Sequence, residues 1–186
     1  MTGKRFCPDD PERRGWQDPV QILSAIGLGP GMVFVDIGCN EGYFALPAAR
    51  MVGPGGTVFG VDISPGAIEH LASRAREEGL TNIILRVGSA EDTVVGRKCA
   101  DFVFFGITLH DFRDPSKAIM NAREMLKPSG LLIDLDWKDE PTPFGPPPDI
   151  RFSVGKARSL IGSLGFRVHS ETGAGPYHYM ITARPE

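Results

Sequence analysis

The sequence predicts an α/β fold: a single domain with a seven-stranded, mostly parallel sheet, helices on both faces, and an antiparallel hairpin at its C-terminal end. Short apolar segments alternate with amphipathic helical segments over most of the chain, which is the order expected of crossovers between parallel strands. The last two apolar segments lie too close together for a crossover, so we expect them to pair antiparallel. A length of 186 residues fits one such domain. We expect residues 1–17 to form an N-terminal arm and residues 18–186 the domain.

The expected strands are short and rich in Val, Ile, Leu and Phe, as strands buried on both faces of a parallel sheet should be. Two further runs near the C-terminus, joined by a Gly- and Pro-containing turn, form the hairpin. In chain order, the expected strands are residues 32–37, 57–61, 83–87, 102–105, 131–134, 167–171 and 177–183.

The expected helices begin at recognisable capping signals. Asp18, Ser64 and Asp114 each precede a proline, which places a side-chain acceptor at the N-cap and Pro at the first helical position. Glycine or proline follows each of the later helices and ends it. The expected helices are residues 19–27, 43–51, 65–78, 115–126 and 153–164.

The composition disfavours several classes of function. A net charge of -3 argues against nucleic acid as a partner, because duplex binding needs a basic face. No apolar stretch reaches the roughly 20 residues of a membrane span, and no signal peptide is expected. Three widely spaced cysteines do not suggest a disulfide framework. We therefore expect a cytoplasmic protein, and a homodimer is left open.

The turn after the first strand predicts a cofactor site with an unusual charge. Residues 33–44 read Val-Phe-Val-Asp-Ile-Gly-Cys-Asn-Glu-Gly-Tyr-Phe, and no Lys or Arg occurs from residue 31 to residue 49. Asp36 and Glu41 would repel a pyrophosphate but attract an ammonium and a sulfonium. The segment from Gly38 to Gly42 also has no glycine at the middle position of the dinucleotide fingerprint G-x-G-x-x-G. The turn therefore favours S-adenosylmethionine (SAM), whose carboxylate the loop amides are expected to bind.

The next strand ends point to the adenosine part of the same ligand, because ligands of such sheets lie beyond the carboxyl ends of the strands. Asp62 ends the second strand and can accept both ribose hydroxyls, although a helix-start residue stabilised by the helix dipole is the alternative. Ile63 is expected to pack against the adenine. The loop with Ser89 follows the third strand and can read the adenine edge, and Gly106 after the fourth permits close approach.

Four segments in this order resemble the class I SAM-dependent methyltransferases, in particular the ubiquinone/menaquinone-biosynthesis-like type 11 group: Val-Asp-Ile-Gly-Cys-x-x-Gly, Gly-Val-Asp-Ile-Ser, Gly-Ser-Ala-Glu-Asp and Met-Leu-Lys-Pro-Ser-Gly-Leu-Leu. The resemblance implies a Rossmann-like domain whose last strand is antiparallel. Many relatives have Asp where this chain has Ser89, so Ser89 or Glu91 would contact the adenine. The implied cofactor-binding residues are Asp36, Gly38, Cys39, Asn40, Glu41, Gly42, Asp62, Ile63, Ser89, Ala90, Glu91, Phe105 and Gly106.

The resemblance implies methyl transfer to a small-molecule acceptor by in-line displacement, in which the protein mainly aligns the acceptor. A base is needed only if the acceptor must lose a proton. The proline-rich residues 141–148 are expected to form a lid lined by Phe144 and Trp137. No metal site is expected. The candidate catalytic residues are His110, Asp111, Trp137, Lys138 and Arg151.

Each of these candidates has a plainer alternative, and so has the function. His110 and Asp111 would otherwise only start a loop, Trp137 would be ordinary core, and Lys138 and Arg151 would be solvated charges. The same fold could also serve as a non-catalytic SAM-binding module or methylate a macromolecule. An NAD(P)-dependent oxidoreductase is disfavoured by the acidic loop.

Overall fold

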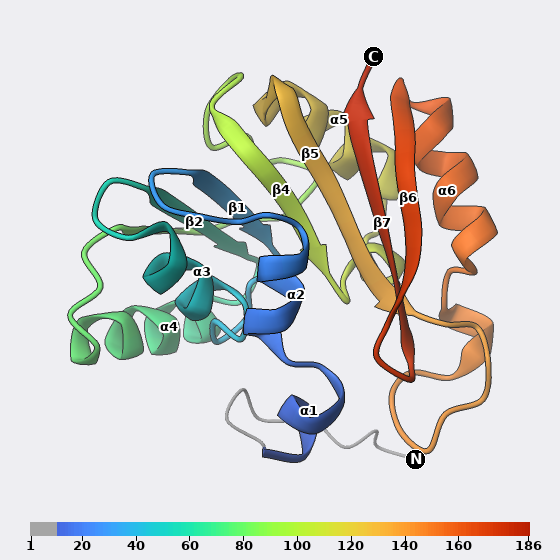
Figure 1. The fold of residues 1–186 in the computed structure, drawn as a ribbon, viewed down its shortest axis with the longest axis horizontal. Coiled ribbons are helices and arrows are strands. Elements are labelled where there is room, and N and C mark those ends of the chain that lie inside the picture. Colours follow the sequence, from blue (N-terminus) through green and yellow to red (C-terminus); the bar gives the residue numbers. More distant parts are fainter. Residues whose placement is uncertain (1–10) are drawn as a thin grey trace.

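A computed structural model describes residues 11–186, and within that range the strands form one seven-stranded sheet (Figure 1). The order is β3-β2-β1-β4-β5-β7-β6, and β7 runs antiparallel to both β5 and β6. The predicted α/β architecture and its C-terminal hairpin are thereby confirmed. The strands are β1 (Val33–Ile37), β2 (Thr57–Asp62), β3 (Ile83–Val87), β4 (Ala100–Gly106), β5 (Leu126–Trp137), β6 (Phe166–Ala174) and β7 (His178–Pro185).

The predicted capping residues start three of the helices. The Asp18 carboxylate accepts from the amide of Val20 at 2.8 Å, and Asp114 accepts from the amide of Lys117 at 3.0 Å. The Ser64 hydroxyl accepts from a first-turn amide at 3.3 Å. The helices are α1 (Pro11–Trp16), α2 (Pro19–Ala25), α3 (Ala45–Val52), α4 (Pro65–Glu77), α5 (Pro115–Met125) and α6 (Val154–Ser163), with single 3-10 turns η1 (Leu109–Asp111) and η2 (Pro148–Ile150).

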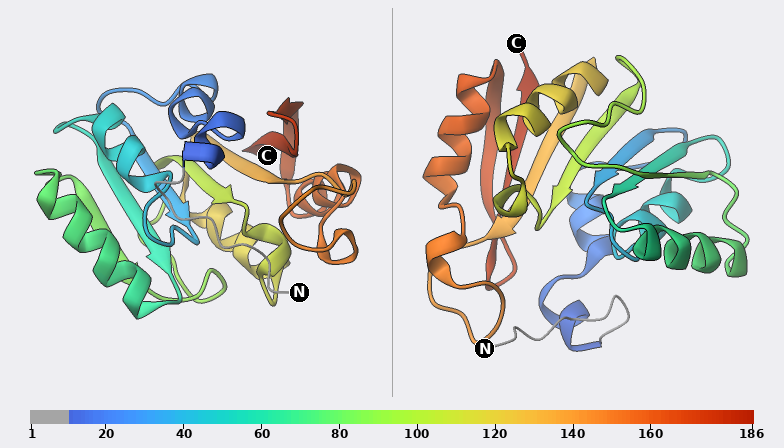
Figure 2. Two further views of the ribbon diagram at one scale, coloured as in Figure 1. Left: turned by 90° about the horizontal axis from the view of Figure 1, so that it is seen from below. Right: turned by 180° about the vertical axis from the view of Figure 1, so that it is seen from behind.

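The helices cover both faces of the sheet, and the sheet separates the hydrophobic core into two layers (Figures 1 and 2). On one face, α2, α3 and α4 pack over Phe34 and Phe104, whose rings are 5.5 Å apart. On the other, α5 and α6 pack over Val35 and Val103. Consecutive residues of a strand point to opposite faces, so the uninterrupted apolar runs seen in the sequence fill both layers.

Strand β5 is longer than the sequence predicts. Residues Leu126–Ser129 continue it in extended conformation, with Ala100 opposite Leu126 and an irregular register before Phe102. Lys127 lies in this segment and pairs with Asp101 at 2.8 Å, and the same carboxylate accepts the amide of Val33. These contacts with residues distant in sequence hold the segment in the sheet. The sequence Lys-Pro-Ser-Gly is typical of a turn and does not indicate them.

The segment expected to be an arm contains the short helix α1, which packs on the domain; residues 1–10 lie outside the described residues. The Trp16 ring lies 6.0 Å from that of Trp137 and 5.0 Å from that of Phe144. The division at residue 17 stays a prediction. In residues 11–186, no helix is long and apolar enough to cross a membrane.

Candidate functional site

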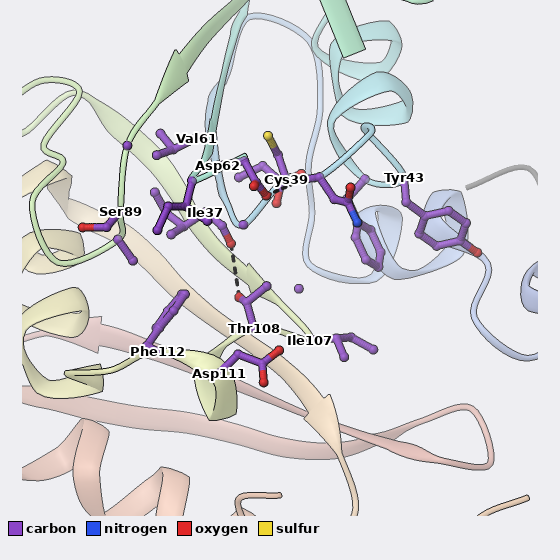
Figure 3. A pocket seen from close by; sticks show the side chains of 18 of the residues that line it. Ile37, Cys39, Tyr43, Val61, Asp62, Ser89, Ile107, Thr108, Asp111 and Phe112 are labelled. Atoms are coloured by element: carbon purple, nitrogen blue, oxygen red, sulfur yellow. Dashed lines mark hydrogen bonds between the residues drawn. The ribbon is translucent and has the colours of Figure 1, made fainter. Parts of the chain in front are cut away.

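A cavity of about 470 Å³ lies where the parallel strands end, beyond β1, β2, β3 and β4 (Figure 3). Strand β1 lies between β2 and β4, so the chain order reverses at this point of the sheet, which is the usual place of a ligand site in such folds. Most of the predicted cofactor residues meet here. Those that line the cavity are Asp36, Gly38, Cys39, Asn40, Glu41, Asp62, Ile63, Ser89, Ala90, Glu91 and Gly106.

Gly42 and Phe105, predicted to touch the cofactor, support the cavity from behind. Gly42 has φ +90°, and a Cβ there would lie 2.3 Å from a methyl carbon of Leu71 in α4. Phe105 is fully buried and packs edge-on against Phe112, which itself lines the cavity. Both residues therefore fix the position of the wall without forming its surface.

The amides of the β1–α3 loop are already used within the protein. Those of Gly38 and Cys39 donate to the carbonyl of Val61 at 2.8 and 3.1 Å, and that of Asn40 donates to Asp62 at 2.8 Å. The expectation that these loop amides bind a ligand carboxylate is therefore wrong for these three. The bonds instead hold the loop against the end of β2.

Asp62 joins two of the ligand loops. One carboxylate oxygen accepts from Asn40, and the other accepts from the amide of Ser64 at 2.9 Å. The second bond matches the helix-start role considered from the sequence, and the first ties Asp62 to the glycine loop. A carboxylate oxygen accepts more than one hydrogen bond, so Asp62 can still bind ligand hydroxyls in the cavity that it lines.

Asp36 is a buried carboxyl group with an unsatisfied oxygen. Its side chain lines the cavity and is 2 % exposed, and Oδ2 has no hydrogen-bond partner in the described part of the chain. Burial, and then the charge of Asp62, raises its pKa to about 8, against an opposing hydrogen bond from the amide of Ala45. A buried acceptor without a partner is costly, and a ligand ammonium would supply one. This part of the cavity therefore fits the amino group of SAM.

The loop after β3 is held by its own polar side chains. The Ser89 hydroxyl donates to Asp92 at 2.9 Å, and Glu91 accepts from the amide of Asp114 at 3.2 Å. Burial raises the pKa of Glu91, but backbone hydrogen bonds from its own amide and from Asp114 outweigh it and leave the pKa below its usual value. Beside this loop Ile63 is 71 % exposed at the cavity, which leaves an apolar surface for a flat base.

The cavity also contains residues that the sequence did not reveal. Arg13 of α1 lines it, with its guanidinium 3.6 Å from the centre of the Tyr43 ring. Ile107 has φ +64°, a conformation rare for β-branched residues, and Thr108 donates to the carbonyl of Ile37 at 3.2 Å. Arg13 is distant in sequence from the ligand loops, and no local pattern foretells a positive φ at isoleucine.

His110 and Asp136 form a buried pair directly behind the cavity. His110 Nδ1 lies 2.8 and 2.9 Å from the two Asp136 oxygens, and their side chains are 3 % and 0 % exposed. Burial lowers the pKa of His110, but the hydrogen bond and charge of Asp136 raise it more, to a net value above normal. Asp111 lines the cavity and places an oxygen 3.4 Å from His110 Nε2. Of the two predicted residues, Asp111 reaches the cavity, and His110 stands behind it.

A second buried carboxyl, Asp134, lies two residues before Asp136 on the same face of β5. Burial and the charge of Asp136 raise the pKa of Asp134 well above its usual value. The neutral form of Asp134 is therefore favoured over its charged form. No group of three or more His, Cys, Asp or Glu residues within 11–186 is arranged to hold a metal ion.

Trp137, Lys138 and Arg151 lie outside the cavity. The Arg151 guanidinium donates to the carbonyls of Lys138, Glu140 and Pro146 and to a threonine hydroxyl, so all five of its N–H groups are engaged. Lys138 Nζ donates to the carbonyl of Pro176 at 3.1 Å. These bonds hold the proline-rich loop in place, and direct contact of either residue with an acceptor stays a prediction.

Comparison with known proteins agrees with this geometry. A family model described as a methyltransferase domain matches residues 28–143. Nocamycin O-methyltransferase of Saccharothrix syringae is 34% identical over 60% of this chain and 40% of its own. Aklanonic acid methyltransferase DauC of Streptomyces sp. (strain C5) is 36% identical over 53% of this chain and 44% of its own. The chain thus spans less than half the length of these curated relatives. A solved structure, a SAM dependent methyltransferase from Aquifex aeolicus, superposes with a TM-score of 0.91 at 26% identity, covering 98% of this chain and 100% of that one.

Proposed function

Because the chain belongs to the methyltransferase domain family, of the class I type that uses SAM, we propose that it transfers the methyl group of SAM to a small-molecule acceptor. The observation that carries the proposal is the convergence of four strand-end loops on one cavity that contains the unsatisfied carboxyl oxygen of Asp36. Two of the curated relatives are named for small-molecule acceptors, which supports that class here.

The lining residues divide the cofactor between them. Asp62 holds the ribose hydroxyls, Ile63 packs on the adenine, and Asp36 accepts from the ammonium. Arg13 supplies the positive charge for the carboxylate of SAM, because the amides of Gly38, Cys39 and Asn40 are already hydrogen-bonded within the protein. Bound SAM supplies a methyl group that its sulfonium already activates. What remains for the protein is to align the acceptor with that group and to keep water out.

The second task is to remove a proton when the acceptor is a hydroxyl. Asp111 has its carboxylate in the cavity and is the group that accepts this proton. His110, held by Asp136, lies 3.4 Å away and positions Asp111. The raised pKa of His110 favours its protonated form, which balances the charge of Asp111. In this scheme His110 and Asp136 are positioning residues, and Asp111 is the catalytic residue.

Two measurements test the proposal in sequence. Isothermal titration with SAM, NAD⁺ and ATP should give saturable binding for SAM only, and Asp62→Ala should weaken it by at least about 100-fold, since two hydrogen bonds to a charged group are lost. Incubation with SAM carrying a deuterated methyl group and a size-fractionated cell extract should then label small molecules. The absence of SAM binding would refute the proposal. Binding without any labelled product would favour the non-catalytic module, and label only on macromolecules would correct the acceptor class.

A further inference from the structure

A slot of aromatic rings lies at the end of β5 and the start of β7. Its walls are Trp137, Phe144, Tyr177 and His178, with ring centres 4.2 Å apart for Trp137 and His178 and 5.0 Å apart for Phe144 and Tyr177. We call these four residues the aromatic slot. They come from two strands and two loops, and one ring from elsewhere in the chain fills the space between them.

The occupant of the aromatic slot is Trp16, carried by the short helix α1. Its ring is stacked on His178, with 5.4 Å between centres and 15° between planes, and lies 5.0 Å from Phe144 and 5.8 Å from Tyr177. A six-residue helix has little stability of its own. The flat ring that fills the slot therefore belongs to an element held by its contacts with the domain and not by its own helical hydrogen bonds.

The packing leaves buried polar atoms unsatisfied. His178 is fully buried, and neither ring nitrogen has a hydrogen-bond partner among residues 11–186. Burial, and then the charges of Arg13, Arg151 and Lys138, lowers its pKa to about 3, so the ring is neutral and offers one donor and one acceptor. Gln17, next to Trp16, is 1 % exposed and its Nε2 likewise has no partner in the described range. Buried groups without partners are rare in a finished core.

The aromatic slot is connected to the proposed catalytic machinery through β5 and through α1. Trp137 directly follows Asp136, the residue that holds His110. Helix α1, which carries Trp16, also carries Arg13 of the cavity wall. Tyr43, another lining residue, donates its hydroxyl to the carbonyl of Gln17. Figure 1 shows α1 at the same end of the sheet as the turn between β6 and β7.

We propose that the aromatic slot is the acceptor subsite, that its ligand is a flat aromatic ring bearing a polar substituent such as a phenol, and that Trp16 occupies its place until α1 moves. The stacked position of Trp16 shows the ring orientation that the slot accepts. His178 bonds the polar substituent, which its present neighbours do not. The inference rests on the proposed function and adds to it the class of acceptor.

The two tryptophans of the chain provide the readout, because both lie in this cluster. In Trp16→Ala the single remaining indole N–H signal reports on Trp137 alone. We expect 2-naphthol to shift that signal saturably and to bind at least about tenfold more tightly than to the wild type, since the built-in competitor is gone. Cyclohexanol, which has a hydroxyl but no flat ring, should leave the signal in place.

A second variant displaces α1 and keeps the Trp16 side chain. A Cβ on Gly175, in the turn between β6 and β7, would lie 2.3 Å from the backbone oxygen of Trp16. Gly175→Ala should therefore loosen Trp16 and also tighten 2-naphthol binding. Gly53→Ala is the matched control, because Gly53 has nearly the same φ (+64° against +66°) with nothing within 4 Å of a Cβ. It should bind 2-naphthol like the wild type.

The outcomes separate this inference from the function that it rests on. If folded Trp16→Ala shows no movement of the Trp137 signal with 2-naphthol, or if Gly175→Ala and Gly53→Ala respond alike, the slot is closed core and the inference is overturned. SAM is titrated into the wild type in parallel. Its failure to bind would overturn the proposed function, whereas normal SAM binding without 2-naphthol binding would overturn the acceptor subsite alone.

Discussion

Replacing Asp36 by Asn should make the empty protein more stable at neutral pH, although the residue serves the ligand site. With a pKa of about 8 instead of 3.8, Asp36 keeps a proton in the native state between about pH 4 and pH 8 that the unfolded chain has released. The unfolded chain thus binds fewer protons, and wild-type stability falls as pH rises through this window. The slope is about 1.4 kcal/mol per pH unit.

At pH 7 this cost amounts to roughly 4 kcal/mol, because the window from pH 4 to pH 7 spans about three units. Asn keeps the shape and an acceptor for the Ala45 amide, but its own N–H groups are buried without partners, which costs about 1–3 kcal/mol. We therefore expect Asp36→Asn to exceed the wild type by about 1–3 kcal/mol at pH 7 and to show no advantage at pH 5.

Urea denaturation of both proteins without ligand, at each pH unit from 5 to 8, measures this difference directly. A difference in the free energy of unfolding that stays constant across the series would refute the reasoning, because only a buried ionising carboxyl produces the slope. The same variant should bind SAM at least about tenfold more weakly, because Asn cannot release a proton to become the carboxylate that pairs with the ligand ammonium. Adenosine, which lacks the methionine part of SAM and therefore its α-amino group, should bind both proteins equally.

Three further changes test other parts of the site. Gly38→Ala should lower the free energy of unfolding by about 1–3 kcal/mol, because its Cβ would lie 2.4 Å from a methyl carbon of Thr108 at a φ of +78°; an unchanged urea midpoint would contradict the packing described. Asp136→Asn should lower the pKa of His110, because burial is then opposed only by the charge of Asp111, and the stabilisation that the protonated His110–Asp136 pair adds at low pH is lost; an unmoved C2–H titration by NMR would refute the pair. Arg151→Lys should raise amide exchange at least about tenfold in the loop that it holds, because an ammonium cannot replace five directed donors; unchanged protection would show that those bonds are dispensable.

The sequence predicted those features that depend on local pattern. Alternating apolar segments and capping residues such as Ser64 locate the strands and helices, because burial and capping act within a few residues. The ends of four strands carry the ligand loops, so Asp36 and Asp62 are both expected at one ligand site, and both line the cavity. Family membership and the SAM-type cofactor, expected from the order of these motifs, are confirmed.

Features that depend on distant contacts could not be read from the sequence. Trp16 sits in a polar segment, and its partners lie more than 100 residues away, at Trp137 and His178. From the sequence, Arg151 is expected to be a charged surface residue. It is buried in the structure because several carbonyl groups of one loop accept hydrogen bonds from its guanidinium. The positive φ of Ile107 has no signal in residue type. A homodimer and a cytoplasmic location stay predictions.

The central claim is that the acid-lined cavity at the carboxyl ends of β1 to β4 holds the methyl donor. A crystal structure with S-adenosylhomocysteine, the product form of that donor, tests it most directly. We expect the ribose hydroxyls within hydrogen-bond distance of Asp62 and the amino group against Asp36, with the base on Ile63. Nucleoside density anywhere else on the protein, with this cavity left unfilled, would contradict the account.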